Sequence, residues 1–470
     1  MISGSASSSN HLMAFPPHHS HQAPPATGST DSPPHTHPPD RRFFFWTDRN
    51  LTGDHIRILL VTWITWTLGA MDAMIYSLVL TPALKDLLQA ANPDQTISTG
   101  LIGWYGGVIF STFLMGWALG GILLGSLADY FGRRRILMLG IALVAISTGL
   151  AAVSQSWWHL AGVRFITGMG IGGLWASGAA LVAEVWPEQS RSRAAGFLQS
   201  AWGFGFFLAA ALNLLVKNFG WRGFFAIGML TLGSAWLVAR HTHDSNRWNH
   251  LHAAEHRAHS SPHVRIGQLF GRQYRRATWT GTGLAFVAVF GLWGATNWTP
   301  SLIQALPDLA GLEPAEIATS VSYAVMLLNV GALAGYFSFG PLADRIGRKP
   351  AFALMCGGSL LMIPATFFFP HSYAIALMLL PTLGFFTKGV FGGFPLYLPE
   401  LYPTRLRSTG AGFCYNAGRI VASASPFLTG TLVSILGSFG LAASAVAAVY
   451  IAGLAILPFA IETKNRPLPD

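Results

Sequence analysis

The chain has 470 residues, of which 51% are hydrophobic and only 10% are charged. Water-soluble domains carry roughly 25% charged residues, so this composition excludes an ordinary soluble protein and predicts an integral membrane protein. The net charge of +10 does not indicate a nucleic-acid partner, because the arginines form short clusters between apolar segments. The positive-inside rule requires such clusters in cytoplasmic loops.

The N-terminal stretch, residues 1–53, is rich in Ser, Pro and His and contains no long apolar run. This composition predicts a disordered cytoplasmic tail. A second hydrophilic stretch, 241–276, is also rich in histidine. Histidine-rich segments can bind metal ions, but solvated polypeptide is the simpler interpretation, so we predict no metal site and no cofactor.

Apolar segments follow at lengths close to the roughly 20 residues that cross a bilayer as a helix. We predict twelve transmembrane helices, at 56–82, 103–128, 136–155, 158–185, 194–216, 222–240, 277–303, 318–342, 350–369, 373–399, 409–435 and 439–461. The expected fold is therefore all-α and membrane-embedded, with two six-helix bundles at 54–240 and 277–462. The stretch 241–276 is then a cytoplasmic central loop, and 463–470 is a second cytoplasmic tail, because arginines concentrate on that side.

One loop motif occurs twice, once in each half of the chain. The two copies are Gly125-Ser-Leu-Ala-Asp129-Tyr-Phe-Gly132-Arg133-Arg134 and Gly340-Pro-Leu-Ala-Asp344-Arg-Ile-Gly347-Arg348-Lys349. Each copy is followed by a glutamate, Glu184 or Glu400, and by a basic cluster. Two apolar halves that repeat in the same order are typical of a duplicated membrane transporter.

The doubled motif resembles that of the major facilitator superfamily, where it lies between helices 2 and 3 and between helices 8 and 9. The resemblance extends over about 55–462. It implies two bundles that work by alternating access, with a cytoplasmic gate that these clusters hold closed in the outward-facing state. The gate residues carried over by the resemblance are Gly125, Asp129, Gly132, Arg133, Arg134, Glu184, Arg191, Gly340, Asp344, Gly347, Arg348, Glu400, Arg405 and Arg407.

Two charges inside predicted helices indicate proton coupling. Asp72 lies in the helix at 56–82 and Arg164 in the helix at 158–185, and a rise of about 1.5 Å per residue places them at similar depth. A carboxylate that alternately pairs with an arginine and takes up a proton is a simple coupling device, because pairing favours its charged form and desolvation its neutral form. A static ion pair that only joins the helices is the alternative.

Lys388 and Arg419 are expected near the membrane midplane, where transporter binding sites lie between the two halves. Two cations at one depth favour an anion, and a guanidinium can hold a carboxylate through two hydrogen bonds. Alternatively, Arg419 pairs with a helix-end carbonyl or a neighbouring acid. Further candidate contacts of the substrate are Tyr76, Trp175, Asn297, Tyr397 and Asn416.

Within the superfamily, the chain most resembles the metabolite:proton symporters for aromatic acids, sialic acid and lactate-type monocarboxylates. The resemblance rests on the segment around Asp72, the glycine run after Arg164, the loop of Glu184 and the pair Gly418-Arg419. Aromatic-acid members usually have two acids in helix 1, whereas this chain has Asp72 alone. The resemblance implies a proton-coupled importer of a small organic anion, a monocarboxylate. We expect it in the plasma membrane and as a monomer. No enzymatic activity is predicted, because the predicted spans hold no nucleophile–base or metal-ligand constellation.

Three other functions stay open. Glu462-Thr-Lys464 resembles the end of sugar porters and suggests a sugar or polyol substrate. An efflux antiporter would have a large apolar cavity, although two midplane cations disfavour it. A membrane sensor would use the histidine-rich segments for signalling, and deletion of residues 1–50 would distinguish it from a transporter, which keeps uptake.

Overall fold

The computed structural model describes residues 51–469 except 92–98, 217–219, 256–263, 305, 369–371 and 437. Most of the predicted tail at 1–53 therefore lies outside the described residues. Within the described ranges the chain is helical and contains no strand.

The first half contains helices at all six predicted positions. They are α1 (Gly53–Ala91), α2 (Thr99–Phe131), α3 (Arg133–Ala152), α4 (Trp157–Val185), α5 (Arg191–Val216), and a sixth built from α6 (Gly220–Gly228), η3 (Met229–Leu232) and α7 (Gly233–His241). Two short helices follow in the central stretch, α8 (Asn246–Glu255) and α9 (Val264–Gln268).

The second half repeats this order with more interruptions. Its helices are α10 (Arg275–Gly294), η4 (Thr296–Trp298), α11 (Thr299–Gln304), η5 (Pro307–Leu309), α12 (Pro314–Ile346), α13 (Arg348–Phe368), α14 (Tyr373–Gly389), η6 (Val390–Gly393), α15 (Phe394–Glu400), η7 (Thr404–Leu406), α16 (Arg407–Ala422), α17 (Ser425–Leu436), α18 (Phe439–Ala447), α19 (Val449–Ile456) and η8 (Leu457–Phe459). The tighter turn of η6 (Val390–Gly393) falls between Gly389 and Pro395, because glycine and proline weaken the regular helix ladder.

Among the described residues, nine helices are long and apolar enough to cross a membrane. The other three predicted positions are occupied by α5, by α10 with the interruption at η4, and by α16 and α17 with a break between them. The all-α membrane architecture predicted from the sequence is confirmed.

Glycines bring α2 and α4 into backbone contact. A Cβ added at Gly116 would lie 2.1 Å from the carbonyl oxygen of Phe165, and one at Gly168 would lie 2.1 Å from that of Phe113. Only glycine allows this approach, which is common between membrane helices. The contact fixes Arg164 of α4 beside α2.

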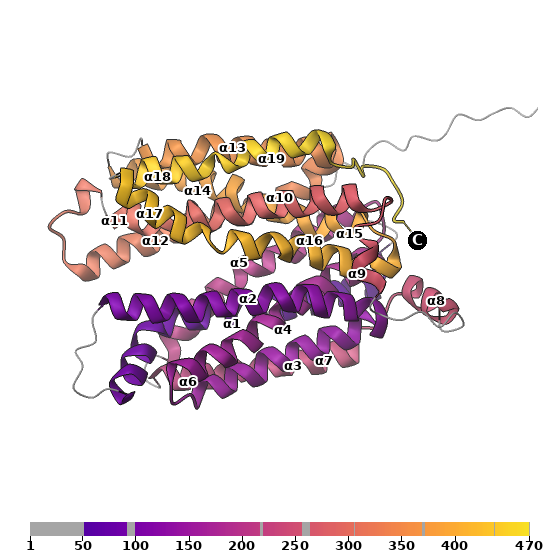
Figure 1. Ribbon diagram of the computed structural model, residues 1–470, viewed down its shortest axis with the longest axis horizontal. Coiled ribbons are helices and arrows are strands. Elements are labelled where there is room, and N and C mark those ends of the chain that lie inside the picture. Colours follow the sequence, from indigo (N-terminus) through magenta and orange to yellow (C-terminus); the bar gives the residue numbers. More distant parts are fainter. Residues whose placement is uncertain are drawn as a thin grey trace, which may run out of the picture. The chain divides into compact units, whose positions relative to one another are not determined.

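The helices of each half pack mainly on one another (Figure 1). Between the halves, α2 and α4 of the first half contact α16, and α5 contacts α12, α15 and η6.

Candidate transport site and gate

Asp72 and Arg164 form an ion pair inside the first half. Arg164 Nη1 lies 3.2 Å from Asp72 Oδ1, and both side chains are fully buried. The second carboxylate oxygen does not contact the guanidinium, so the pair is not bidentate. The guanidinium also lies over the ring of Phe113, 4.9 Å from its centroid. The two charges that residue counting placed at similar depth therefore lie side by side, and their part in proton coupling stays a prediction.

A central cavity lies between the halves. Its volume is about 40 Å³, enough for a few water molecules. The lining side chains come from both halves and are mostly aromatic: Trp66, Trp117, Gln199, Trp202, Val289, Leu292, Trp293, Tyr336, Phe391, Tyr415 and Arg419.

Arg419 is the cationic side chain in this lining. It is only 4% exposed, and its guanidinium carbon lies 4.1 Å from the ring centroid of Trp117 and 5.1 Å from that of Tyr415. No carboxylate among the described residues pairs with it, and its buried Nε has no hydrogen-bond partner there. The ring faces stabilise the cation, the Tyr415 hydroxyl accepts one hydrogen bond from it, and the remaining N–H groups are left for another acceptor.

Lys388 does not line the cavity with Arg419, although both were predicted to hold one substrate. Its ammonium donates to Asn329 Oδ1 at 2.8 Å and lies 5.9 Å from the ring centroid of Phe206. Counting residues along the helix gave the depth of Lys388 in the membrane but not the direction in which its side chain points.

The other predicted substrate contacts lie outside the cavity lining. Asn416 donates to the Gly412 carbonyl within α16, and the Tyr76 hydroxyl donates to the Gly106 carbonyl. Trp175 instead stacks on Tyr415 across the two halves, with ring centroids 4.0 Å apart.

Tyr397 lies at the end of α15, next to the gate. Its hydroxyl accepts a hydrogen bond from the backbone nitrogen of Ile461 at 3.1 Å. Asn297 belongs to η4, and its side chain lies outside the described residues.

Sequence reasoning missed most of the lining. Gln199 carried a usable signal, since an uncharged amide within an apolar helix is a candidate for a binding role. The tryptophans carried none, because tryptophan also faces lipid and membrane interfaces.

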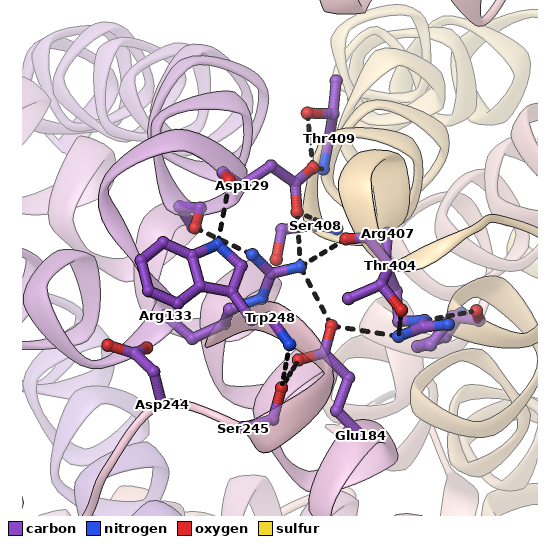
Figure 2. A network of polar contacts seen from close by, with 12 residues as sticks. Asp129, Arg133, Glu184, Asp244, Ser245, Trp248, Thr404, Arg407, Ser408 and Thr409 are labelled. Atoms are coloured by element: carbon purple, nitrogen blue, oxygen red, sulfur yellow. Dashed lines mark hydrogen bonds and ion pairs between the residues drawn. The ribbon is translucent and has the colours of Figure 1, made fainter. Parts of the chain in front are cut away.

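Away from the cavity, a buried ionic network joins the halves (Figure 2). Arg133 lies 2.8 Å from Asp129 and 2.9 Å from Glu184, and Arg407 of the second half lies 3.0 Å from the same oxygen of Glu184. All four side chains are fully buried. Glu184 therefore bridges one arginine from each half.

The same network includes the start of α16. The Asp129 carboxylate accepts hydrogen bonds from the backbone nitrogens of Ser408 at 3.1 Å and Thr409 at 2.7 Å. A carboxylate at a helix N-terminus is stabilised by the helix dipole. Arg133 also donates to the Thr404 carbonyl at 2.5 Å.

The second motif copy builds a similar cluster with α5. Arg348 lies 2.9 Å from Glu400 and 3.2 Å from Asp344, and the Ser192 hydroxyl of α5 donates to Asp344. Arg191 lies farther from Glu400, at 3.9 Å. The ion pair that crosses between the halves is thus closer in the first copy.

Two motif glycines adopt backbone conformations that other residues rarely take. Gly132 and Gly347 both have φ near 100°. Helices α3 and α13 begin directly after these glycines. Acidic side chains from distant loops accept hydrogen bonds from their first backbone N–H groups: Asp244 accepts from Arg134 N, and Glu462 accepts from Arg348 N. Burial opposes the charge on Glu462, but these backbone donors outweigh it and leave its pKa below the usual value.

The other two motif glycines allow the halves to meet. A Cβ at Gly125 would lie 2.9 Å from the Ser408 carbonyl oxygen, and one at Gly340 would lie 2.3 Å from that of Ser192. Arg405, the remaining predicted gate residue, is exposed.

All hydrogen bonds and ion pairs that cross between the halves, within the described ranges, lie at this end of the bundles. We call this end, built around Asp129, Glu184, Asp344 and Glu400, the gate end. The gate end is closed in this structure.

Closure of the gate end can be tested at Gly412 of α16. An added Cβ there would lie 2.3 Å from the Gly121 carbonyl oxygen of α2. We expect Gly412→Val to open the gate end, so that a cysteine introduced at the buried Leu406 reacts several-fold faster with an impermeant maleimide. Gly357→Val is the matched control, because a Cβ there meets nothing within 4 Å. Unchanged labelling in Gly412→Val would refute a gate that depends on this contact.

A separate contact near the gate end depends on pH. His243 Nε2 lies 2.6 Å from Asp54 Oδ2, and this carboxylate raises the pKa of His243 above 6.5. The resulting stabilisation is complete below the unfolded pKa near 6.5 and disappears as pH rises through the folded pKa. Because both groups are half-exposed, we expect His243→Gln to lower the melting temperature slightly at pH 6 and not at pH 9. An equal fall in melting temperature at pH 6 and at pH 9 would exclude the ion pair as the cause.

Comparison with known proteins decides the family. The profile of the Major Facilitator Superfamily matches residues 62–426, well over half of the chain. The chain belongs to this superfamily. It is a multi-pass membrane transporter rather than an enzyme, as predicted.

Similar proteins include a Haemophilus influenzae protein named for metabolite transport, 33% identical over 81% of this chain and 92% of its own length. A Cupriavidus pinatubonensis protein named for 4-methylmuconolactone transport is 30% identical over 85% of this chain and 89% of its own. The cis,cis-muconate transport protein of Acinetobacter baylyi is 28% identical over 86% and 96%. The predicted superfamily is confirmed, together with the resemblance to its organic-acid branch.

Among solved structures, the proton:xylose symporter XylE has a TM-score of 0.68 with 19% identity, covering 88% of this chain and 97% of its own. This similarity shows the shared fold.

Proposed function

We propose that this transporter imports a small organic anion, a monocarboxylate, together with protons by alternating access of its two halves. The gate end would face the cytoplasm, with both termini on that side of the plasma membrane, and a single chain would be the working unit. The arginines of the gate end support this orientation. The bundles predicted at 54–240 and 277–462 would be the two moving halves.

One observation supports an anionic substrate. Arg419 is buried in the cavity wall, and no carboxylate of the described residues neutralises its charge. A buried cation without a counter-ion is costly, and a substrate carboxylate would supply the missing acceptor through two parallel hydrogen bonds. The surrounding rings of Trp117, Trp202 and Trp293 would cover the apolar part of the substrate. Relatives named for muconate and 4-methylmuconolactone transport agree with an organic acid.

Asp72 is the group that would take the proton. It is fully buried and holds Arg164 through one oxygen only. Protonation would remove the charge attraction, free Arg164 from α1 and allow the helices of the first half to shift. Once the gate end opens, water would reach the carboxyl, which would lose its proton and pair with Arg164 again.

The cavity is too small for an aromatic acid as it stands. Entry of substrate therefore requires the halves to separate on the side away from the gate end, as alternating access supposes. The stack of Trp175 on Tyr415 would close the passage from Arg419 to the gate end.

Uptake into proteoliposomes tests the proposal. The labelled panel is lactate, benzoate, 4-hydroxybenzoate, sialate, cis,cis-muconate and glucose, each with and without an inward proton gradient. We expect one acid to accumulate and a protonophore to abolish its accumulation. Accumulation of glucose with no uptake of any acid would overturn the anion site and support the sugar-porter alternative.

A chain lacking residues 1–50 provides the matched test against a sensor. We expect it to keep the uptake of the full chain. Loss of uptake would assign the tail a part in transport.

A further inference from the structure

Lys388 is a second deep cation that the central cavity does not use. Its ammonium has three hydrogens to donate, and the one acceptor it meets among the described side chains is the neutral Asn329 oxygen, at 2.8 Å. No carboxylate of the described part pairs with it. Lys388 is partly exposed and lies next to Thr387 and Gly389, which are buried.

Helical register places Lys388 next to the cavity. Lys388 precedes the lining residue Phe391 by three residues, and its neighbour Phe206 follows the lining residue Trp202 by four. At about 1.5 Å per residue these separations are roughly 4.5 and 6 Å along the helices. The cluster of Lys388, Asn329 and Phe206 therefore lies about one helical turn from the cavity.

Chain direction shows on which side of the cavity this cluster lies. Helix α5 begins at the gate end with Arg191, so Phe206 is farther from the gate end than Trp202. The segment α14–α15 ends at the gate end with Glu400, so Lys388 is farther from it than Phe391. Lys388 and Arg419 lie equally far along their helices from the gate end, but a helical side chain leans toward the N-terminus of its helix. Helix α14 runs toward the gate end and α16 runs away from it, so the Lys388 ammonium lies farther from the gate end than the Arg419 guanidinium, on the side from which substrate would enter when the gate end is closed.

The cluster also spans the two halves. Phe206 belongs to α5 of the first half, whereas Lys388 and Asn329 belong to α14 and α12 of the second. An ammonium between the halves raises the local concentration of anions. It has the composition of an anion site: one cation with free N–H groups and one amide, whose nitrogen donates to the Val325 carbonyl at 2.9 Å and has a second hydrogen to donate.

We propose that Lys388 and Asn329 form an outer carboxylate site, which the anion occupies before it reaches Arg419. The transfer to Arg419 rests on the proposed function, whereas the outer anion site does not. The residue types suit this order. Lysine is a compact point charge that binds one oxygen and releases it readily, and arginine can hold a carboxylate in bidentate geometry. Sequential sites must bind well enough to admit an ion and weakly enough to release it.

A cysteine at Phe206 tests the outer site without knowledge of the substrate. The two natural cysteines, Cys356 and Cys414, are buried, so Phe206→Cys is the reactive thiol. It is treated, from the face opposite the gate end, with the anionic 2-sulfonatoethyl methanethiosulfonate and, separately, with its cationic trimethylammonium analogue. We expect the anionic reagent to react faster, and Lys388→Met to lower the anionic-to-cationic rate ratio by about tenfold. Lys388→Arg, which keeps the charge, should retain the preference.

Each outcome of these measurements either supports or refutes the outer site. A rate ratio unaffected by Lys388→Met overturns the outer site, whatever the uptake panel shows. A ratio that depends on Lys388 in a protein that takes up no acid keeps the outer site and refutes the proposed function. Where an acid is transported, Lys388→Met should raise its KM about tenfold with kcat within about twofold. A fall in kcat instead would place Lys388 at the central site with Arg419 and refute the transfer.

Discussion

Arg419→Gln should reduce kcat/KM for acid uptake by about 100-fold or more. Loss of one partner from a buried, hydrogen-bonded charge pair costs about 2–5 kcal/mol, and the substrate carboxylate would be that partner. Glutamine keeps much of the side-chain length and one donor group but removes the charge. The initial rate of proton-driven uptake in proteoliposomes measures the effect.

Two further variants separate charge from geometry. Arg419→Lys keeps the cation but loses the planar pair of donors, so an intermediate rate is expected. Arg222→Gln removes an arginine from the exposed ion pair with Asp86, at a distance from the cavity lining, and should leave uptake within about twofold. If Arg419→Gln transports the acid at the unmodified rate, the carboxylate site lies elsewhere.

The sequence predicted the helices well because membrane helices are specified by apolar length. Helix α3, predicted at 136–155, occupies Arg133–Ala152, and the Asp72–Arg164 pair followed from depth alone. Depth is a one-dimensional quantity, which residue counting supplies at about 1.5 Å per residue.

The direction in which a side chain points around its helix axis could not be obtained by counting residues. Trp63 and Trp66 lie one turn apart on α1, yet Trp66 lines the cavity while Trp63 stacks on Phe197. The difference is set by which helices pack against α1 and at what angle, and no local pattern encodes this. Lys388 and Arg419 were grouped by equal depth for the same reason. Contacts from distant loops, such as Asp244 with Arg134, were equally out of reach.

Asp72→Asn should abolish uphill accumulation of the acid under a proton gradient while exchange of internal for external acid continues. Asparagine resembles protonated aspartate in shape and charge, so the variant would behave as permanently loaded with a proton. Exchange of internal for external anion requires no proton release, because the carrier crosses loaded in both directions. Accumulation and counterflow, measured on the same proteoliposomes, distinguish these steps.

Loss of stability is the competing explanation. Asp72→Asn leaves the fully buried Arg164 without its carboxylate, and an uncompensated buried charge costs about 3–5 kcal/mol. The double variant Asp72→Asn/Arg164→Gln removes both charges and should recover the melting temperature. If Asp72 carries the proton, accumulation stays absent in the double variant although the protein is stable. If accumulation returns with stability, the pair only joins α1 to α4, and the proton is carried by another group.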